Sequence, residues 1–215
     1  MGADGGGNER RMNIKPILMN TEMTRAILED RKTATRRVIK EPYYIEDVEV
    51  SQLSGLAMHK GTYITHGMPY PDSPYSVGDV LYVRETWQFI PCISCNSDSC
   101  AETPKTFEDT EMVGDGCFVY RADYPEPQRL VWRPSIHMPK EAARIWLRVT
   151  DMRVERLQDI DDDSVVAEGL NIGDPFDELW DSTIKPTDRE RYGWSANPWV
   201  WVIEFERCEK PMEEG

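Results

Sequence analysis

The chain has 215 residues, of which 40% are hydrophobic, and a formal net charge of −14. This composition predicts one domain with insertions and excludes a disordered chain, because it supplies enough apolar side chains for a core. No run approaches the roughly 20 apolar residues that span a bilayer, so no membrane partner is expected. The negative charge argues against a long duplex nucleic acid as partner, because such binding depends on neutralising phosphates. The remaining candidate partners are a nucleoside, or a short RNA bound in a locally basic groove.

The N-terminus and the cysteines bear on processing and compartment. Residues 1–12 lack the apolar stretch of a signal peptide and are expected to be a disordered leader, with Met12 as an alternative start. The cysteine count of five is odd, which without a secretory signal favours a reducing, cytoplasmic compartment. An insertion at about 90–117 either holds a structural zinc or is a surface loop with incidental thiols. Its cysteines are Cys92, Cys95, Cys100 and Cys117.

The N-terminal part of the chain is predicted to form a strand, a short helix and a second strand. The first strand spans 14–18, and a helix over 20–29 is capped by Asn20 or Thr21. The second strand begins at 38–39. The polar segment between the helix and the second strand therefore lies at a junction, where side chains are commonly exposed to a cleft.

This junction is strongly basic. Between Arg25 and Lys40 there are six basic and two acidic residues, which give a local charge of +4 in a chain of −14. A basic run is usually a solvated face of the protein. A basic island in an acidic chain more often marks a site for an anionic ligand, so the run 30–37 is the candidate functional centre.

The remainder of the chain is predicted to add strands and short helices. An irregular segment over 41–76 precedes strands at 80–83, 118–120, 144–156 and 199–205, and helices are expected at 159–168, ended by Gly169, and at 175–182. The acidic cluster 159–163 suits the positive end of a helix dipole, with a metal loop as the alternative. These elements contain no βαβ repeat and no glycine-rich phosphate loop. They predict an α+β fold, a small mixed β-barrel with short helices and loop insertions, forming a single domain over 13–210.

Several short strings, taken together, resemble the ASCH domain family of the PUA-like superfamily. They are Lys32-x-x-Thr35-x-Arg37, Gly78-Asp79-x-Leu81-x-Val83, Ala167-Glu168-Gly169 and Val202-Ile203-Glu204-Phe205. Longer strings at 84–87, 132–139 and 154–160 resemble its bacteriophage and prophage branch. The resemblance covers most of 14–207 apart from the cysteine insertion. It implies a PUA-like β-barrel, a link to RNA, and a bacterial or phage-infected cytoplasm.

The first string also resembles a small bacterial ASCH enzyme that removes the acetyl group from N4-acetylcytidine. Asp30 stands where the family usually has glycine, and Thr35 where it usually has an acidic residue, but Lys-x-x-Thr is shared with that enzyme. The resemblance implies catalysis by Lys32, Thr35 and Glu168 with no required cofactor. It implies a metal-independent amidohydrolase acting on an N-acylated nucleoside or base. The alternative is a non-catalytic ASCH module that binds RNA or a modified nucleotide.

The chemistry of such a site depends on the protonation of Lys32. A threonine hydroxyl becomes a nucleophile only when a neighbouring base takes its proton. Lysine serves as that base when its pKa falls from about 10.4 to roughly 7–8. Burial and the charge of Arg37 would lower this pKa, whereas an ion pair with Glu168 would raise it. The sequence leaves these two outcomes open.

Five further residues are predicted to bind substrate: Arg36, Arg37, Arg84, Glu85 and His137. The arginines of the basic run suit an anion or a carbonyl oxygen. Arg84 and Glu85 follow a predicted strand at the border of the cleft, and Glu85 is alternatively an ion-pair partner of the arginines of the basic run. His137 lies in a proline-bounded loop, where it either contacts a base edge or bonds to backbone.

Overall fold

The computed structural model describes residues 13–40, 64–65, 68–69, 74–91, 105–109, 112–124 and 130–212. The predicted leader 1–12 and three of the four candidate zinc ligands, Cys92, Cys95 and Cys100, lie outside these residues. No helix in this part of the chain is long and apolar enough to cross a membrane.

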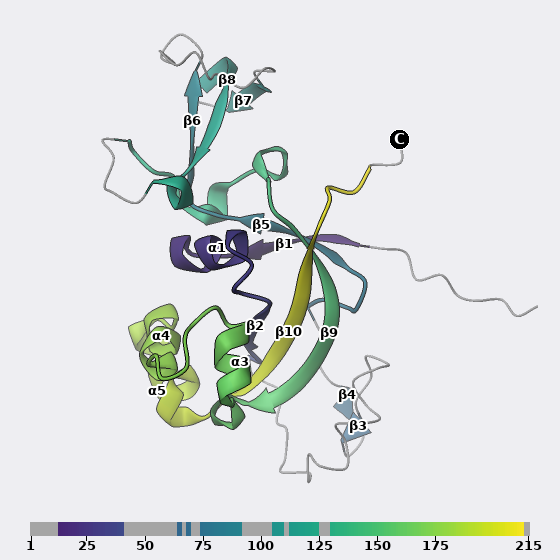
Figure 1. Ribbon diagram of the computed structural model, residues 1–215, viewed down its shortest axis with the longest axis vertical. Coiled ribbons are helices and arrows are strands. Elements are labelled where there is room, and N and C mark those ends of the chain that lie inside the picture. Colours follow the sequence, from purple (N-terminus) through teal and green to yellow (C-terminus); the bar gives the residue numbers. More distant parts are fainter. Residues whose placement is uncertain are drawn as a thin grey trace, which may run out of the picture.

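A curved five-stranded sheet forms the centre of the molecule (Figure 1). In spatial order its strands are β1 (Ile14–Leu18), β5 (Val80–Arg84), β9 (Trp146–Arg156), β10 (Trp199–Cys208) and β2 (Ala34–Val38). β1 pairs with β5 in parallel, and the other neighbours are antiparallel. The long strands β9 and β10 carry most of the curvature, with a register shift between Glu204 and Phe205.

The fold is α+β, as predicted, but the described strands do not show the closed barrel that was expected. β1 and β2 are the two edges of the sheet, and no ladder joins them among the described residues. A side chain bridges the opening instead: Arg37 Nη2 on β2 donates to the carbonyl oxygen of Leu18 on β1 at 2.5 Å. One such bond replaces the row of backbone bonds that would close a barrel.

Two smaller sheets and several short helices complete the structure. Two small antiparallel sheets contain β3 (Ile64–Thr65) with β4 (Met68–Pro69), and β6 (Trp87–Pro91), β8 (Met112–Tyr120) and β7 (Lys105–Asp109) in that order. The α-helices are α1 (Thr21–Leu28), α3 (Asp162–Ala167), α4 (Phe176–Thr183) and α5 (Arg189–Tyr192). The 3-10 turns are η3 (Arg121–Asp123), η4 (Ser135–His137), η5 (Lys140–Ala142), η6 (Leu157–Asp159), η7 (Pro186–Asp188) and η8 (Trp194–Ala196).

The two faces of the β10–β2 pair support different cores. Ile203 and Trp201 pack with Ile17, Ile27 and other apolar residues on one face, next to α1 and β1. Neighbouring positions of β10 point to the opposite face, because successive residues of a strand alternate sides. That second core lies under α3 and α4 (Figure 1), and its buried members are Leu157, Phe176, Trp180, Val200 and Val202.

The predicted cap at the start of α1 and the predicted glycine after α3 are confirmed, and Asp161 is a further cap that was not predicted. Asn20 Oδ1 accepts a hydrogen bond from Met23 N at 2.8 Å and starts α1, while Asp161 Oδ1 accepts from Ser164 N at 2.9 Å and starts α3. Gly169 follows α3 with φ +91°. The acidic cluster at the start of α3 therefore has a structural role, because its Asp161 satisfies a free N–H group of the helix.

The boundaries of β2 differ from the prediction. The strand begins at Ala34 instead of Val38, so Thr35, Arg36 and Arg37 are strand residues and not junction residues. Pairing with β10 overrides the weak strand preference of this polar run, since Arg37 lies opposite Trp201 and Thr35 opposite Ile203. The polar side chains consequently have fixed directions on the two faces of an edge strand.

Candidate functional site

Residues 167–169, at the end of α3, form a strap that holds Glu168 against the basic run. Thr33 N donates to Ala167 O at 2.8 Å, and Lys32 and Glu168 form an isolated antiparallel bridge. The Arg31 guanidinium donates to Gly169 O at 2.5 Å. Three successive residues on each segment are thus linked, and Glu168 folds back beside Lys32 although 136 residues separate them.

The turn after α1 places Lys32 at this strap. Arg31 N and Lys32 N both donate to Ala26 O, at 2.8 and 3.0 Å. Asp30 makes the turn with φ 56°, in the left-handed region that glycine adopts most easily and aspartate tolerates. The Asp30 carboxylate also pairs with Arg207 at 3.1 Å, which fixes the turn to β10.

A buried chain of charges runs through the strap. Lys32 Nζ lies 2.5 Å from Glu168 Oε2 and 3.0 Å from Glu168 O. Arg36 bonds the other carboxylate oxygen, Oε1, at 3.3 Å, and reaches Glu155 Oε2 on β9 at 3.2 Å. The side chains of Lys32, Arg36 and Glu168 are 0%, 1% and 4% exposed. Both oxygens of Glu168 are therefore held, and the carboxylate has one orientation.

Burial dominates the electrostatics of Lys32. Loss of water lowers its pKa, and the positive charges of Arg37 and Arg36 act in the same direction, while the charge and hydrogen bond of Glu168 raise it. The net direction is downward. Of the two outcomes left open by the sequence, the ion pair forms, but it does not outweigh the cost of burying an ammonium group.

Thr35 and Glu168 line one small cavity beside the edge of β2. Its volume is about 40 Å³, and its walls are Met23, Thr35, Arg36, Arg37, Glu168, Phe176, Leu179, Trp180 and Thr183. A buried water needs roughly 10–15 Å³ of such space, so the cavity fits a few waters or a short acyl group. The Thr35 hydroxyl makes no hydrogen bond with any other described residue. Lys32 is not part of this wall, and it lies behind Glu168.

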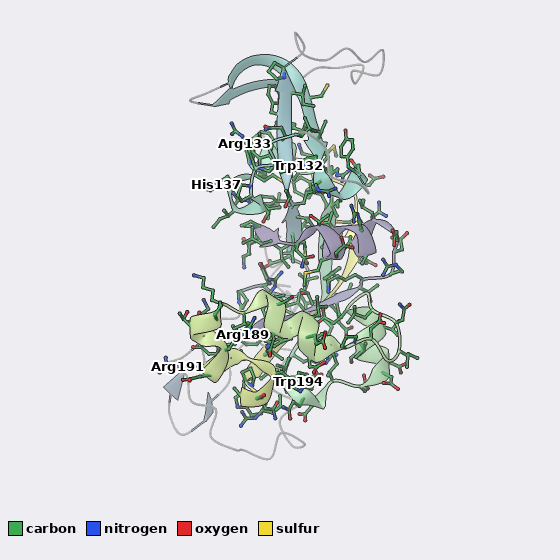
Figure 2. All side chains as sticks on the ribbon, turned by 90° about the vertical axis from the view of Figure 1, so that its left-hand side faces the viewer. Trp132, Arg133, His137, Arg189, Arg191 and Trp194 are labelled. Carbon is green, nitrogen blue, oxygen red and sulfur yellow. The ribbon has the colours of Figure 1, made fainter. Side chains whose placement is uncertain are left out.

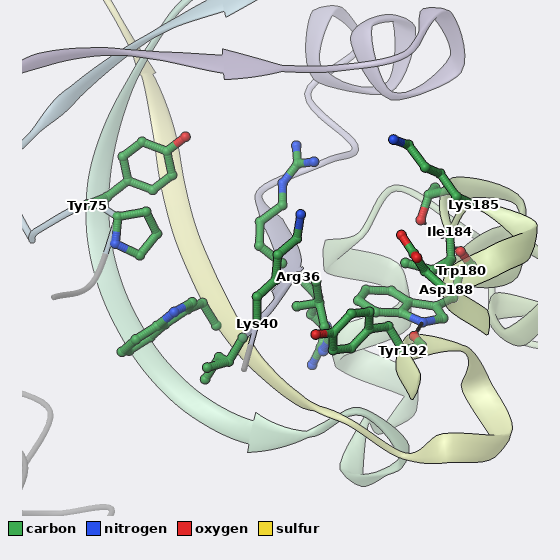
Figure 3. Close-up of a pocket in the computed structure, with 14 residues that line it drawn as sticks. Arg36, Lys40, Tyr75, Trp180, Ile184, Lys185, Asp188 and Tyr192 are labelled. Carbon is green, nitrogen blue, oxygen red and sulfur yellow. Dashed lines mark hydrogen bonds between the residues drawn. The ribbon is translucent and has the colours of Figure 1, made fainter. Parts of the chain in front are cut away.

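A larger groove opens next to the small cavity (Figure 3). Its volume is about 600 Å³, within the range of small-molecule sites. It shares Arg36, Arg37, Trp180 and Thr183 with the cavity, so the two spaces meet along β2 and α4. Its other walls are Val38, Ile39, Lys40, Pro74, Tyr75, Ile184, Lys185, Asp188, Tyr192 and Trp201.

The edge of β2 supplies backbone groups to this groove. Phe205 N donates to Thr33 O and Ile39 N donates to Trp199 O, so the odd-numbered residues exchange bonds with β10. The backbone N–H and C=O of Arg36 and Val38 consequently point away from β10, toward the open edge. Such a donor and acceptor pair suits the edge of a planar polar ligand.

Arg37 stands between the groove and the rest of the sheet. Its guanidinium donates to Leu18 O and lies 3.7 Å from the sulfur of Met19. Burial lowers its pKa, and the nearby Tyr75 and Glu168 oppose that shift. An arginine nevertheless stays charged, so Arg37 brings a fixed positive charge to the wall of both spaces.

Three of the predicted substrate-binding residues lie elsewhere. Arg84 donates to Met138 O at 2.8 Å and to Ile136 O, and thereby fixes the 134–139 loop. His137 is an exposed residue of that loop, near Trp132 and Arg133 and at the opposite end of the molecule from Arg189 (Figure 2). Neither residue lines the cavity or the groove.

Glu85 forms a separate ion pair. Its two carboxylate oxygens bond Arg144 at 2.9 and 3.1 Å, and Arg144 also bonds Asp123 and lies 4.0 Å from the ring centre of Tyr120. Burial raises the pKa of Glu85, although Arg144 opposes the shift. The ion-pair interpretation of Glu85 is correct, but its partner is Arg144 and not the arginines of the basic run.

The zinc hypothesis is not settled by the described residues. Cys117 lies on β8 opposite Ile90, and the other three candidate ligands fall outside the described part. Within that part, no group of three or more His, Cys, Asp or Glu side chains could hold a metal ion.

Sequence reasoning did not assign the groove residues Lys40, Tyr75, Lys185, Tyr192 and Trp201 to a site. For Trp201 the sequence carried one usable signal: alternation along the strand places it on the opposite face from Val200 and Val202. In the structure it shares that face with its cross-strand partner. That partner, Arg37, follows from a pairing register that the sequence does not specify.

Comparisons with protein-family models, with curated proteins and with solved structures gave no match for this chain.

Proposed function

We propose that this protein is a metal-independent amidohydrolase that removes the acyl group from an N-acylated nucleoside or base, built on an ASCH domain with a PUA-like barrel and acting in the cytoplasm of a bacterium or a phage-infected cell. The observation that carries the proposal is the cavity that both Thr35 and Glu168 line, with Lys32 bonded to the carboxylate of Glu168.

The chemistry follows from these positions. Thr35 Oγ attacks the acyl carbon, and its proton passes to the Lys32–Glu168 pair, which acts as one coupled base. The pair then protonates the leaving nitrogen as the C–N bond breaks. Water, deprotonated by the same pair, cleaves the threonine ester, so that one amide and one water become one amine and one carboxylic acid. Arg37 lines the cavity and stabilises the negative charge on the carbonyl oxygen.

Two observations support this assignment. The lowered pKa of Lys32 increases the fraction of neutral amine available to take a proton near neutral pH. Asp30 adopts φ 56°, a conformation that glycine favours, and this accounts physically for a glycine at the same place in the ASCH motif.

Direct assay tests the proposal. The protein is incubated with N4-acetylcytidine, and formation of cytidine and acetate is followed by chromatography. Turnover that falls at least about 10³-fold in Thr35→Val is expected, because removing a nucleophile abolishes the covalent route. Absence of turnover with N4-acetylcytidine and related N-acyl nucleosides, or full activity of Thr35→Val, would exclude the proposed reaction.

A second candidate function is binding of RNA or a modified nucleotide without chemistry. One observation favours it: the Lys32 side chain is 0% exposed and does not line the cavity that Thr35 lines, so the proposed base has no direct access to that space. A binding module would show salt-sensitive association with cytidine-containing RNA, weakened in Arg37→Ala, and no turnover. Turnover by the wild-type protein would reject this alternative.

A further inference from the structure

Two lysines of the groove lack an ion-pair partner within the described part of the chain. Lys40 follows β2, and Lys185 follows the end of α4 at Ile184. Neither ammonium group makes an ion pair or a hydrogen bond with any described residue. Figure 3 shows Lys40 beside β2 in the middle of the view and Lys185 at its upper right, both on the wall of the groove. These are the charges that a ligand in the groove would meet first.

The two arginines of the groove already have partners within the protein. Arg36 is neutralised by Glu168 and Glu155, and Arg37 bonds the backbone of Leu18. Among the described residues of the wall, Asp188 is the one acidic residue. The groove therefore has a surplus of positive charge in a chain whose net charge is −14.

Aromatic rings border the same space. Tyr75 lies on one side of β2, and Trp180 and Tyr192 lie on the other (Figure 3). Tyr75 Oη donates to Pro16 O at 2.9 Å, and Trp180 Nε1 donates to the backbone oxygen of Tyr192 at 2.8 Å, so the rings of Tyr75 and Trp180 are fixed in place. Fixed aromatic faces stack on nucleobases at low entropic cost.

We infer that the groove binds a nucleotide with a 5′-phosphate, its base beside the aromatic residues and its phosphate at Lys40 and Lys185. This inference deepens the proposed function and rests on it for the reaction, since the groove meets the Thr35 cavity at four shared residues. The substrate class is thus an N-acylated nucleoside 5′-monophosphate, in preference to the free nucleoside.

Charge selects a monoester over an RNA strand. A phosphomonoester carries about −1.5 to −2 charges at pH 7, which two ammonium groups match, whereas each diester carries one. A longer RNA would place further phosphates against a protein of net charge −14, outside the basic groove.

Binding tests the inference without requiring turnover. Tryptophan fluorescence, which reports on Trp180 and Trp201 in the wall, is titrated with cytidine, cytidine 5′-monophosphate and a short oligocytidine. The monophosphate is expected to bind about tenfold more tightly than cytidine, a difference of about 1.4 kcal/mol. Lys40→Gln/Lys185→Gln removes that preference and leaves the cytidine affinity unchanged. Lys210→Gln, an exposed lysine outside the groove, serves as the matched control and preserves it.

The outcomes separate this inference from the proposed reaction. Equal affinity for cytidine and its monophosphate, a preference that survives in the double variant, or tighter binding of the oligonucleotide would each overturn the nucleotide site. If the monophosphate preference stands while no N-acyl nucleoside or nucleotide is hydrolysed, the nucleotide site holds and the amidohydrolase proposal fails. If N4-acetylcytidine and its 5′-monophosphate are hydrolysed at equal rates, the amidohydrolase proposal holds and the nucleotide site fails.

Discussion

Lys32 and Glu168 are joined through a backbone bridge and through Lys32 Nζ, which lies 2.5 Å from Glu168 Oε2 and 3.0 Å from Glu168 O. The backbone bridge brings the two residues together, and the side-chain bond then fixes the carboxylate at the wall of the Thr35 cavity. Because the pair is buried, its charges interact strongly with each other and are costly to separate. The pair therefore ties the stability of the strap to the chemistry of the site.

Removal of one partner should destabilise the protein. Lys32→Met leaves a buried carboxylate with Arg36 alone, and Glu168→Gln leaves a buried ammonium group, so each change should cost about 3–5 kcal/mol in the free energy of unfolding. Chemical denaturation measures this loss. Glu206→Gln is the control, because its pair with Arg148 spans 4.0 Å and is exposed, and its loss should cost less than about 1 kcal/mol. Equal effects of the buried and exposed changes would contradict the assigned geometry.

Thr35→Val should separate activity from stability. The Thr35 hydroxyl has no described partner, so its replacement by a methyl group of similar shape should change the free energy of unfolding by less than about 1 kcal/mol. Activity on an N-acyl nucleoside should be lost, whereas Thr35→Ser, which keeps a hydroxyl on Cβ, should retain a measurable rate. A valine variant that unfolds, or a serine variant as inactive as the valine variant, would argue for a purely structural threonine.

Local patterns predicted the frame of this site, and tertiary pairing determined its details. The cap at Asn20, the strand that contains Trp201 and the helix end at Gly169 follow from short-range chemistry, and the structure has all three. The strand position of Thr35 was missed, because a Thr-Arg-Arg run has weak intrinsic preference and only its pairing with β10 makes it a strand.

The predicted binding set was less accurate because proximity in sequence does not give direction in space. Arg84 ends β5 and Glu85 follows it, but both bond to other segments, at Met138 and Arg144. Conversely, Lys40 and Lys185 are 145 residues apart and meet at one groove because β2 and α4 pack together. The α+β class was predictable, but barrel closure depends on a β1–β2 ladder that the described residues lack.

The lowered pKa of Lys32 predicts that its contribution to stability rises with pH. In the unfolded chain the lysine titrates at its ordinary value of about 10.4, above its value in the fold. Between the two values the unfolded chain binds more protons, so the contribution of Lys32 to stability rises with pH. The free energy of unfolding of the wild type, relative to Lys32→Met, should therefore increase from neutral pH toward about pH 10. A relative stability that falls over this range would mean that Glu168 raises the pKa after all.

Gly169 should be the least replaceable glycine near the site. It has φ +91°, and an added Cβ would lie 2.8 Å from Ala26 Cβ and 3.0 Å from Lys32 Cβ. Gly169→Ala combines the left-handed backbone cost of roughly 1–2 kcal/mol with displacement of the strap that holds Glu168. We expect a loss of stability larger than that cost and a loss of hydrolysis in the fraction that remains folded.

Gly173 provides the matched control for this glycine. It has φ +89°, and nothing lies within 4 Å of its added Cβ. Gly173→Ala should cost only the backbone strain, roughly 1–2 kcal/mol, and should keep full activity. Thermal unfolding and the deacylation assay on both variants measure the difference. If the two substitutions cost the same and both variants keep the proposed activity, the close contact of Gly169 with Lys32 does not position the proposed Lys32–Glu168 pair.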